Sequence, residues 1–254
     1  MKIKSFFYIA FSILISFNSL AQNKERKFKI HTLAFYNLEN LFDTINDVNK
    51  NDEASPIMEI KFNRGNIYKQ KVTNMARVIS EIGYDVTNRP PTIIGICEVE
   101  NRNVVEDLIA NEKLSKYNYG IVHYDSPDRR GIDVGLLYNK DIFKVINSNS
   151  HVLYINYNNT SDRSFTRDQL VVSGKLDGEL IHLIVNHWPS RGADETKRMA
   201  AAEVNNSIID SLRKIHNNPK IITMGDFNDD PFDKSIKKIL GAKKKIEDVD
   251  KVDK

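Results

Sequence analysis

The strongest constraint on the fold is a series of short apolar runs that alternate with helical patterns. Apolar residues recur at helical spacing over residues 72–82 and 201–215, which predicts two amphipathic helices. Four other runs are typical of β-strands, and a polar residue follows each of them: residues 28–36 lead into Asn37, 92–97 into Glu98, 180–185 into Asn186 and His187, and 221–224 into Gly225 and Asp226. The pattern predicts an α/β fold.

Two hairpin signals show that the predicted sheets are not purely parallel. The dipeptide Asp177-Gly178 separates the apolar runs 170–176 and 180–185 and is typical of a tight hairpin turn. A polar turn at 126–131 joins the strand-like runs 119–124 and 133–138. Because hairpins make antiparallel pairs and the helical segments make crossovers, we expect two mixed sheets packed as a sandwich and flanked by helices.

Composition narrows the class of protein. The 254 residues are 41% hydrophobic and 28% charged, which is enough apolar surface for one core and excludes a disordered tail or a collagen-like fibre. The single cysteine, Cys97, excludes a disulfide-stapled miniprotein. Since Cys97 ends an apolar run, we interpret it as a small buried hydrophobic residue.

The N-terminus has the pattern of a secretory signal peptide. Lys2 and Lys4 precede an apolar run at 6–17, and small residues at Ser19 and Ala21 suit cleavage after Ala21. We therefore predict a signal peptide at 1–21, one domain at 22–254 and an exported product that is periplasmic, surface-bound or extracellular; an N-terminal membrane anchor is the alternative. Removing two of the 37 basic residues leaves 35 against 34 acidic ones, so net charge predicts no general attraction to nucleic acid.

The polar residues after the strands are candidates for a functional site. Side chains at this position are held by a rigid scaffold and still reach solvent, and Asn37, Glu98, His187 and Asp226 all occupy it. For any one of them the simpler interpretation is an ordinary loop start. Periodicity leaves open whether the four strand ends share one rim.

Five segments, in this order, resemble the endonuclease/exonuclease/phosphatase superfamily of deoxyribonuclease-like, metal-dependent phosphoesterases. The Gly-Asp-x-Asn motif at 225–228 is the most specific of them. The segments are FYNLENLFD (35–43), ICEVEN (96–101), RGIDVGLLY (130–138), NHWPSR (186–191) and GDFNDDP (225–231). The resemblance implies a four-layer αββα sandwich of two mixed, mostly antiparallel sheets.

The resemblance also implies roles for the site residues. Glu98 is the metal ligand, helped by the amide oxygen of Asn37 or by Asp226; Asp226 orients or deprotonates the attacking water, while Asn228 and His187 donate hydrogen bonds to the phosphoryl group. These roles suit phosphodiester hydrolysis, in which a hard cation and positioned donors stabilise charge on the phosphoryl oxygens. The implied cofactor is Mg²⁺, with Mn²⁺ or Ca²⁺ as alternatives.

Further residues have both a functional and a structural interpretation. Arg167, together with Arg163 and Arg191, is a candidate phosphate contact through its planar guanidinium, and a solvated surface arginine is the alternative. Residues 226–230 also fit a turn and helix cap ahead of 233–240. Trp188 beside His187 is interpreted as packing.

One family segment is absent. The 254 residues contain no Ser-Asp-His segment after the Gly-Asp-x-Asn motif, so the resemblance implies a chain that is incomplete at its C-terminus and lacks the last strands. The main expectation is an exported metal-dependent phosphodiester hydrolase, a monomeric nuclease acting on DNA or RNA. Phospholipid and sugar phosphate, as for sphingomyelinase-type or phosphoinositide-type enzymes, are alternative substrates. A catalytically impaired fragment that only binds metal or phosphate is the second hypothesis.

Overall fold

The computed structural model describes residues 28–156 and 161–249. The chain divides into a unit of Met1–Ile30 and a unit of His31–Lys254, and all helices and strands given below belong to the second unit. The predicted signal peptide at 1–21 lies outside the described residues. Within the described ranges, no helix has both the length and the apolar character needed to cross a bilayer.

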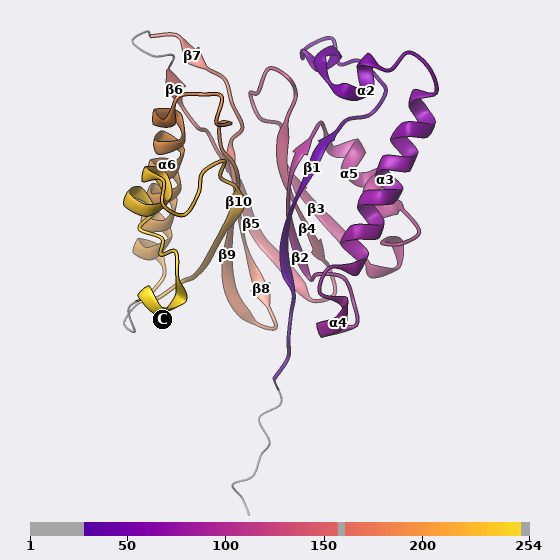
Figure 1. Cartoon of the computed structure of the whole chain (residues 1–254). Coiled ribbons are helices and arrows are strands. Elements are labelled where there is room, and N and C mark those ends of the chain that lie inside the picture. The colour runs from indigo at the N-terminus through magenta and orange to yellow at the C-terminus, as the bar shows by residue number, and fades with distance from the viewer. Residues whose placement is uncertain (1–27, 157–160, 250–254) are drawn as a thin grey trace, which may run out of the picture. The chain divides into compact units, whose positions relative to one another are not determined.

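The first sheet has four strands in the order β1-β2-β4-β3 (Figure 1). Its first pair is parallel and the other two pairs are antiparallel, as the hairpin signal at 126–131 predicted. The predicted strand at 28–36 is corrected, because the register with the neighbouring strand begins only at Leu33, and Phe28 is exposed. The strands are β1 (Leu33–Leu41), β2 (Ile93–Val99), β3 (Tyr119–His123) and β4 (Asp133–Asn139).

The second sheet has the order β10-β9-β8-β5, again with one parallel and two antiparallel pairs. The hairpin predicted at Asp177-Gly178 is confirmed, and both turn residues have the positive φ that such a tight turn requires. The strands are β5 (Phe143–His151), β8 (Gln169–Leu176), β9 (Glu179–His187) and β10 (Lys220–Asp226), and a separate two-stranded ribbon consists of β6 (Ile155–Asn156) and β7 (Arg163–Ser164).

Helices cover the outer face of each sheet. Both predicted amphipathic helices are present, and a third begins at Asn101, whose side chain accepts a hydrogen bond from the backbone of Val104. The α-helices are α2 (Pro56–Glu59), α3 (Arg64–Glu81), α4 (Tyr84–Thr87), α5 (Arg102–Ala110) and α6 (Glu195–Ile215). Short 3-10 and π turns are η1 (Asp52–Ala54), η2 (Ser115–Tyr117), η3 (Ser235–Ile239) and η4 (Ile246–Asp248).

The core is layered in the way the resemblance implied. Alternate residues of β2 face opposite sides: Ile94 and Ile96 pack against α3 and α5, while Ile93 and Cys97 pack between the two sheets. On the far side, Ile208 of α6 packs on the second sheet. The unit is therefore a four-layer αββα sandwich (Figure 1), and Cys97 is the buried hydrophobic residue that the sequence predicted. After β10, the described residues contain η3 and η4 but no further strand.

Candidate metal centre

Parallel pairing explains why four distant polar side chains meet at one rim. In the first sheet Asn37 of β1 is level with Cys97, the residue before Glu98, and in the second sheet Asp226 is level with His187. The parallel strands of each pair end on the same side, so each sheet presents two of the four residues together. The sheets pack face to face, which brings the two pairs into one mouth.

Backbone irregularities aim the side chains of the first sheet. Glu98 has a left-handed backbone with φ 58°, and the register of β2 shifts at this residue; Glu39 and Asn40 on β1 also have positive φ at a second shift. A left-handed conformation costs a residue with a Cβ on the order of 1–3 kcal/mol, and such strain is concentrated at functional sites. The sequence placed Asn37 and Glu98 beyond their strands, whereas both lie inside strands at bulges.

Asn37 links the two carboxylates. Its Nδ2 donates to Oε1 of Glu98 at 3.0 Å and to Oδ2 of Asp226 at 3.1 Å, and its Oδ1 accepts from the backbone N–H of Glu39 at 2.8 Å. The second carboxylate oxygen of Glu98 accepts from the backbone of Asn40 at 3.0 Å. In the structure the Asn37 amide oxygen accepts a backbone N–H and its amide nitrogen is the donor to both carboxylates, so ligation of a metal by this oxygen stays a prediction.

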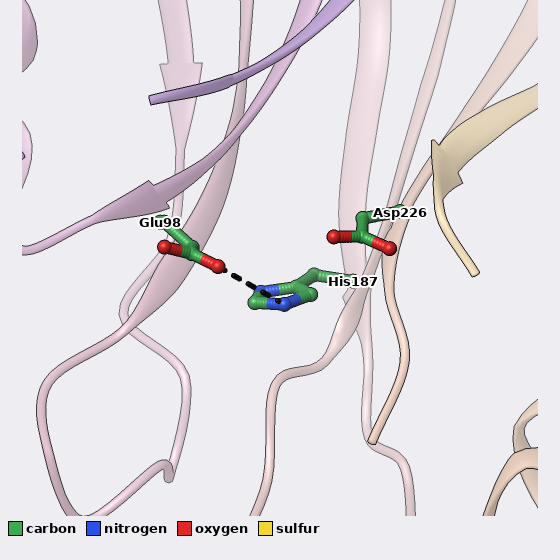
Figure 2. Close-up of side chains that lie close together, drawn as sticks. All are labelled: Glu98, His187 and Asp226. Carbon is green, nitrogen blue, oxygen red and sulfur yellow. Dashed lines mark ion pairs between the residues drawn. The ribbon is translucent and has the colours of Figure 1, made fainter. Parts of the chain in front are cut away.

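His187 completes the group from the second sheet. Its Nε2 lies 3.7 Å from Oε1 of Glu98, as Figure 2 shows, and the side chain is buried. Burial, followed by the positive charges of Arg167 and Arg130, lowers the pKa of His187 to about 3. The imidazole is therefore neutral at physiological pH. Its buried Nδ1 has no hydrogen-bond partner among the described residues.

Glu98, His187 and Asp226 fit a divalent cation. Each offers one ligand atom, and these atoms lie within 4.8 Å of one another. The two carboxylate oxygens suit a hard divalent ion such as Mg²⁺ or Mn²⁺, and the neutral imidazole nitrogen adds a donor of the kind that transition ions prefer. A cation also compensates the two negative charges that converge here. The structure thus brings His187, expected only as a hydrogen-bond donor, into the candidate ligand set.

The Gly-Asp-x-Asn segment is both a turn and part of the site. Oδ1 of Asp226 accepts from the backbone N–H of Asn228 at 3.0 Å, which is an Asx turn. The side-chain amide of Asn228, expected to face phosphoryl oxygens, donates to the backbone carbonyl of Trp188 at 3.0 Å. Asn228 therefore links the ends of β9 and β10. Trp188 is fully buried and packs edge-on against Phe227, in agreement with its interpretation as packing.

Arg167 has a different place from the one predicted. It is buried, its Nη1 lies 3.2 Å from Oδ2 of Asp128, and it donates to the backbone carbonyls of His187 and Trp188. In the structure Arg167 fixes the end of β9 and so positions His187, and its contact with a phosphate stays a prediction. Arg191 is exposed and paired with Asp230 and Asp233.

The sequence did not predict the buried hydrogen bonds that hold the ends of β9 and β10 in place. The side-chain amide of Asn186 donates to Oγ1 of Thr223 at 3.0 Å and to the Met224 carbonyl at 3.1 Å, and Nδ2 of Asn205 donates to Oδ1 of Asn186 at 3.1 Å. A Cβ added at Gly225 would lie 2.3 Å from the carbonyl oxygen of Asn186, so only glycine fits immediately before Asp226.

A buried ion pair also anchors the segment after Asp226. Nε of Arg198 on α6 lies 2.6 Å from Oδ1 of Asp229, and both side chains are less than a tenth exposed. The same guanidinium donates to the carbonyls of Ser190 and Ala193, in the loop that follows β9. The only sequence signal for this pair is two charged residues, one within an amphipathic helix and one within a loop, which is too common to be informative.

A second group of possible ligands lies on β3 and β4 and has a structural explanation. Oδ2 of Asp133 lies 3.1 Å from Nε2 of His123, and Oδ1 of Asp133 accepts from the backbone of Ser126 at 2.6 Å. Both Asp133 oxygens thus fix the turn between the two strands. Asp125, the third member, is 81% exposed on its side chain. The first group is therefore the candidate metal centre.

Comparison with known proteins agrees with the fold. The model of the endonuclease/exonuclease/phosphatase family matches residues 32–253, and the chain belongs to this family. No match is found among curated proteins.

Solved structures give the same fold at low identity. A mannosyl-6-phosphatase of Bacteroides thetaiotaomicron is 17% identical, with 84% of this chain and 70% of that chain covered and a TM-score of 0.54. A family protein from Bacteroides thetaiotaomicron is 16% identical, covers 81% and 66%, and has a TM-score of 0.53. The human Nocturnin catalytic domain with bound sulfate is 19% identical with a TM-score of 0.49; the match covers 66% of this chain and 60% of that domain.

Proposed function

We propose that the protein is a divalent-metal-dependent phosphodiester hydrolase whose substrate is nucleic acid. The observation that carries the proposal is the convergence of Glu98 and Asp226, from different sheets, on one amide of Asn37 beside the neutral imidazole of His187. Carboxylates that share one cation and face a neutral donor are what hydrolysis of a phosphoester requires. The family match supports the same chemistry.

Glu98, His187 and Asp226 would hold the metal, which when bound supplies positive charge to the phosphoryl oxygens. Asp226 uses one lone pair of each oxygen for Asn228 and Asn37, and its remaining lone pairs accept a proton from the attacking water. Because His187 is neutral, its Nε2 would keep a lone pair for the cation, and the ring proton would then stay on the buried Nδ1. Asn37 keeps both carboxylates oriented throughout.

The identity of the substrate is part of the proposal, because the fold does not determine it. The solved structures of the same fold carry different names, among them a mannosyl-6-phosphatase and Nocturnin, so the fold alone does not select a substrate. Phospholipid headgroups and sugar phosphates are the alternatives. A second candidate function is binding of metal and phosphate without turnover, which the same cluster of ligands would allow.

The test is hydrolysis by the purified protein of plasmid DNA, of bis(4-nitrophenyl) phosphate and of mannose 6-phosphate, with Mg²⁺ and with chelator. We expect cleavage of both diesters that depends on the metal. Asp226→Asn should lower kcat by about 10²–10⁴-fold with the fold retained, because it removes the base and keeps the shape. Asp210→Asn, on the exposed face of α6, is the matched control.

Metal binding without cleavage of any substrate would support the second candidate. Cleavage of mannose 6-phosphate alone would favour a sugar phosphatase.

We also propose that the protein is exported. The proposal rests on Lys2 and Lys4, the apolar run at 6–17 and the small residues that end at Ala21. N-terminal sequencing of the mature protein should begin at Gln22. A mature protein that retains Met1 would contradict cleavage and favour an anchor.

A further inference from the structure

An arginine-rich surface borders the metal centre. We define this arginine rim as Arg129, Arg130 and Arg163 with the aromatic rings of Tyr154 and Phe165. We propose that the arginine rim binds a second phosphate of a nucleic-acid substrate, next to the phosphodiester at the metal centre, and that Arg130 is its central residue. The inference rests on the proposed function and assigns the residues that select the substrate.

Arg130 is held in place and still reaches solvent. Its Nε and Nη2 donate to the two carboxylate oxygens of Asp128 at 3.2 and 3.1 Å, and its backbone N–H donates to the same carboxylate at 2.9 Å. Asp128 is only 3% exposed, whereas the Arg130 side chain is 52% exposed. The guanidinium is therefore preorganised, and Nη1 points its donors away from the Asp128 fork, which suits binding of an anion.

The support of Arg130 is continuous with the metal centre. Asp128 also bonds Nη1 of Arg167 at 3.2 Å, and Nε of Arg167 donates to the carbonyl of His187 at 3.2 Å. One buried carboxylate thus lies between two guanidinium groups, which leaves a net positive charge beside the site.

Two cavities meet at Arg130. A cavity of about 190 Å³ is lined by Arg130, Arg129, Phe165 and Arg167, and reaches the segment that follows His187. A second cavity of about 260 Å³ is lined by Arg130 and Asn40, the residue whose backbone N–H binds Glu98. Arg130 therefore lies between two hollows, one lined by Pro189 and Ser190 and one lined by Asn40, in which neighbouring phosphates of a strand would lie.

Aromatic rings and further arginines extend the rim. The guanidinium groups of Arg129 and Arg163 lie 5.2 and 4.9 Å from the ring centre of Phe165, and Arg163 lies 4.8 Å from that of Tyr154. Phe165 is 39% and Tyr154 is 64% exposed. Nε and Nη2 of Arg163 are buried, so Arg129 and Arg130 carry the charge that faces a strand, and the exposed edges of the rings add apolar contact for its bases. A phosphate monoester of a sugar has no second phosphate to fill this surface.

The test compares a substrate with many phosphates and a substrate with one. Arg130→Gln and Arg129→Gln are assayed on a single-stranded oligonucleotide and on bis(4-nitrophenyl) phosphate, and Arg77→Gln on α3, which pairs only with Glu81, is the matched control. A lost charge-assisted hydrogen bond should lower the ratio of kcat/KM for the oligonucleotide to kcat/KM for the small diester by about tenfold. The control should keep the wild-type ratio. An unchanged ratio in both rim variants would overturn the inference.

Binding separates this inference from the proposed function. Fluorescence anisotropy of a labelled oligonucleotide is measured with Ca²⁺ over a range of salt concentrations, so no turnover is needed. Each rim variant should weaken binding about tenfold and reduce the slope of log Kd against log salt by about 1. If the rim variants bind more weakly and the wild type hydrolyses none of the substrates, the proposed function is refuted, but the inference that the arginine rim binds nucleic acid is retained. Two results would refute binding of nucleic acid by the arginine rim. One is wild-type affinity for the oligonucleotide in both variants, and the other is weakened binding that is seen only when anionic vesicles replace the oligonucleotide.

Discussion

Asn37 on β1 and Asp226 on β10 are 189 residues apart in the sequence and are joined by a hydrogen bond of 3.1 Å between Nδ2 and Oδ2. Each lies on an edge strand of its own sheet, so this bond connects the two sheets at the metal centre. The same Nδ2 bonds Glu98. The metal centre is therefore assembled by the packing of the two sheets. A change at the edge of either sheet should shift the positions of both carboxylates.

Gly225→Ala should displace Asp226 at the end of β10. The added Cβ would lie 2.3 Å from the carbonyl oxygen of Asn186, so the backbone at Asp226 must move. We expect a loss of about 1–3 kcal/mol in the free energy of unfolding, as for other overpacked sites. Misplacement of Asp226 by about 1 Å should also lower kcat by about 10²-fold. Denaturant unfolding and steady-state kinetics measure both effects.

Gly65→Ala is the control for this substitution. Nothing lies within 4 Å of a Cβ added at Gly65, which is in the first turn of α3. Alanine is the better helix former, so the control should keep activity and gain up to about 1 kcal/mol in the free energy of unfolding. Equal behaviour of the two variants would contradict the role given to Gly225.

Arg198→Ala should be strongly destabilising. It leaves Asp229 buried without its cation, which typically costs about 3–5 kcal/mol in the free energy of unfolding. The double variant Arg198→Met with Asp229→Leu should recover part of this loss, because no buried charge then stays unpaired. Arg191→Ala breaks exposed ion pairs and one exposed hydrogen bond to the Asn228 carbonyl, and should cost much less. Chemical denaturation of the four proteins measures the difference; similar losses for Arg198→Ala and Arg191→Ala would contradict it.

His182 should make the fold less stable in acid. The residue is buried on β9, Nδ1 lies 2.7 Å from Oγ of Ser173, and its ring centre is 4.8 Å from that of His216. Burial lowers the pKa of His182 below its usual 6.5, and the neighbouring His216 lowers it further. As pH falls below 6.5 the unfolded chain takes up a proton that the folded chain does not, so the free energy of unfolding falls.

The measurement is urea unfolding from about pH 7 to about pH 5, a range that begins above the usual histidine pKa. His182→Asn keeps a polar atom near Ser173 and removes the titrating ring, so it should lose less stability over this range than the wild type. Part of the slope will persist, since the pKa of the buried His187 is also lowered. An identical slope in variant and wild type would show that His182 does not contribute.

The sequence was informative where local patterns determine structure. The hairpin at Asp177-Gly178 and the helices α3 and α6 follow from turn chemistry and periodicity, and the structure confirms them. The strand β5 was missed because its polar residues, such as Asn147 and Ser148, carry no strand pattern; it is held by pairing with β8. The helix α5 had a usable signal in Asn101, an N-cap ahead of Val104, Val105 and Leu108.

Positions of single side chains were less predictable, because they depend on long-range contacts. The strand pattern located Glu98, but its left-handed backbone arises from a bulge opposite β4 and has no local signature. Arg167 was expected at a phosphate, and its burial results from the acceptors that Asp128, His187 and Trp188 supply from other strands and loops. The meeting of the four polar residues at one rim required the parallel pairs, which a sequence pattern does not reveal.

The most direct test of the metal centre is a titration with Mn²⁺, followed by the loss of the free-ion signal in electron paramagnetic resonance. The wild type should bind one ion, and Glu98→Gln and Asp226→Asn should each weaken that binding by about tenfold or more, because both carboxylates hold the same cation. Asp210→Asn should bind like the wild type. Wild-type affinity in either carboxylate variant would contradict the shared site on which the account depends.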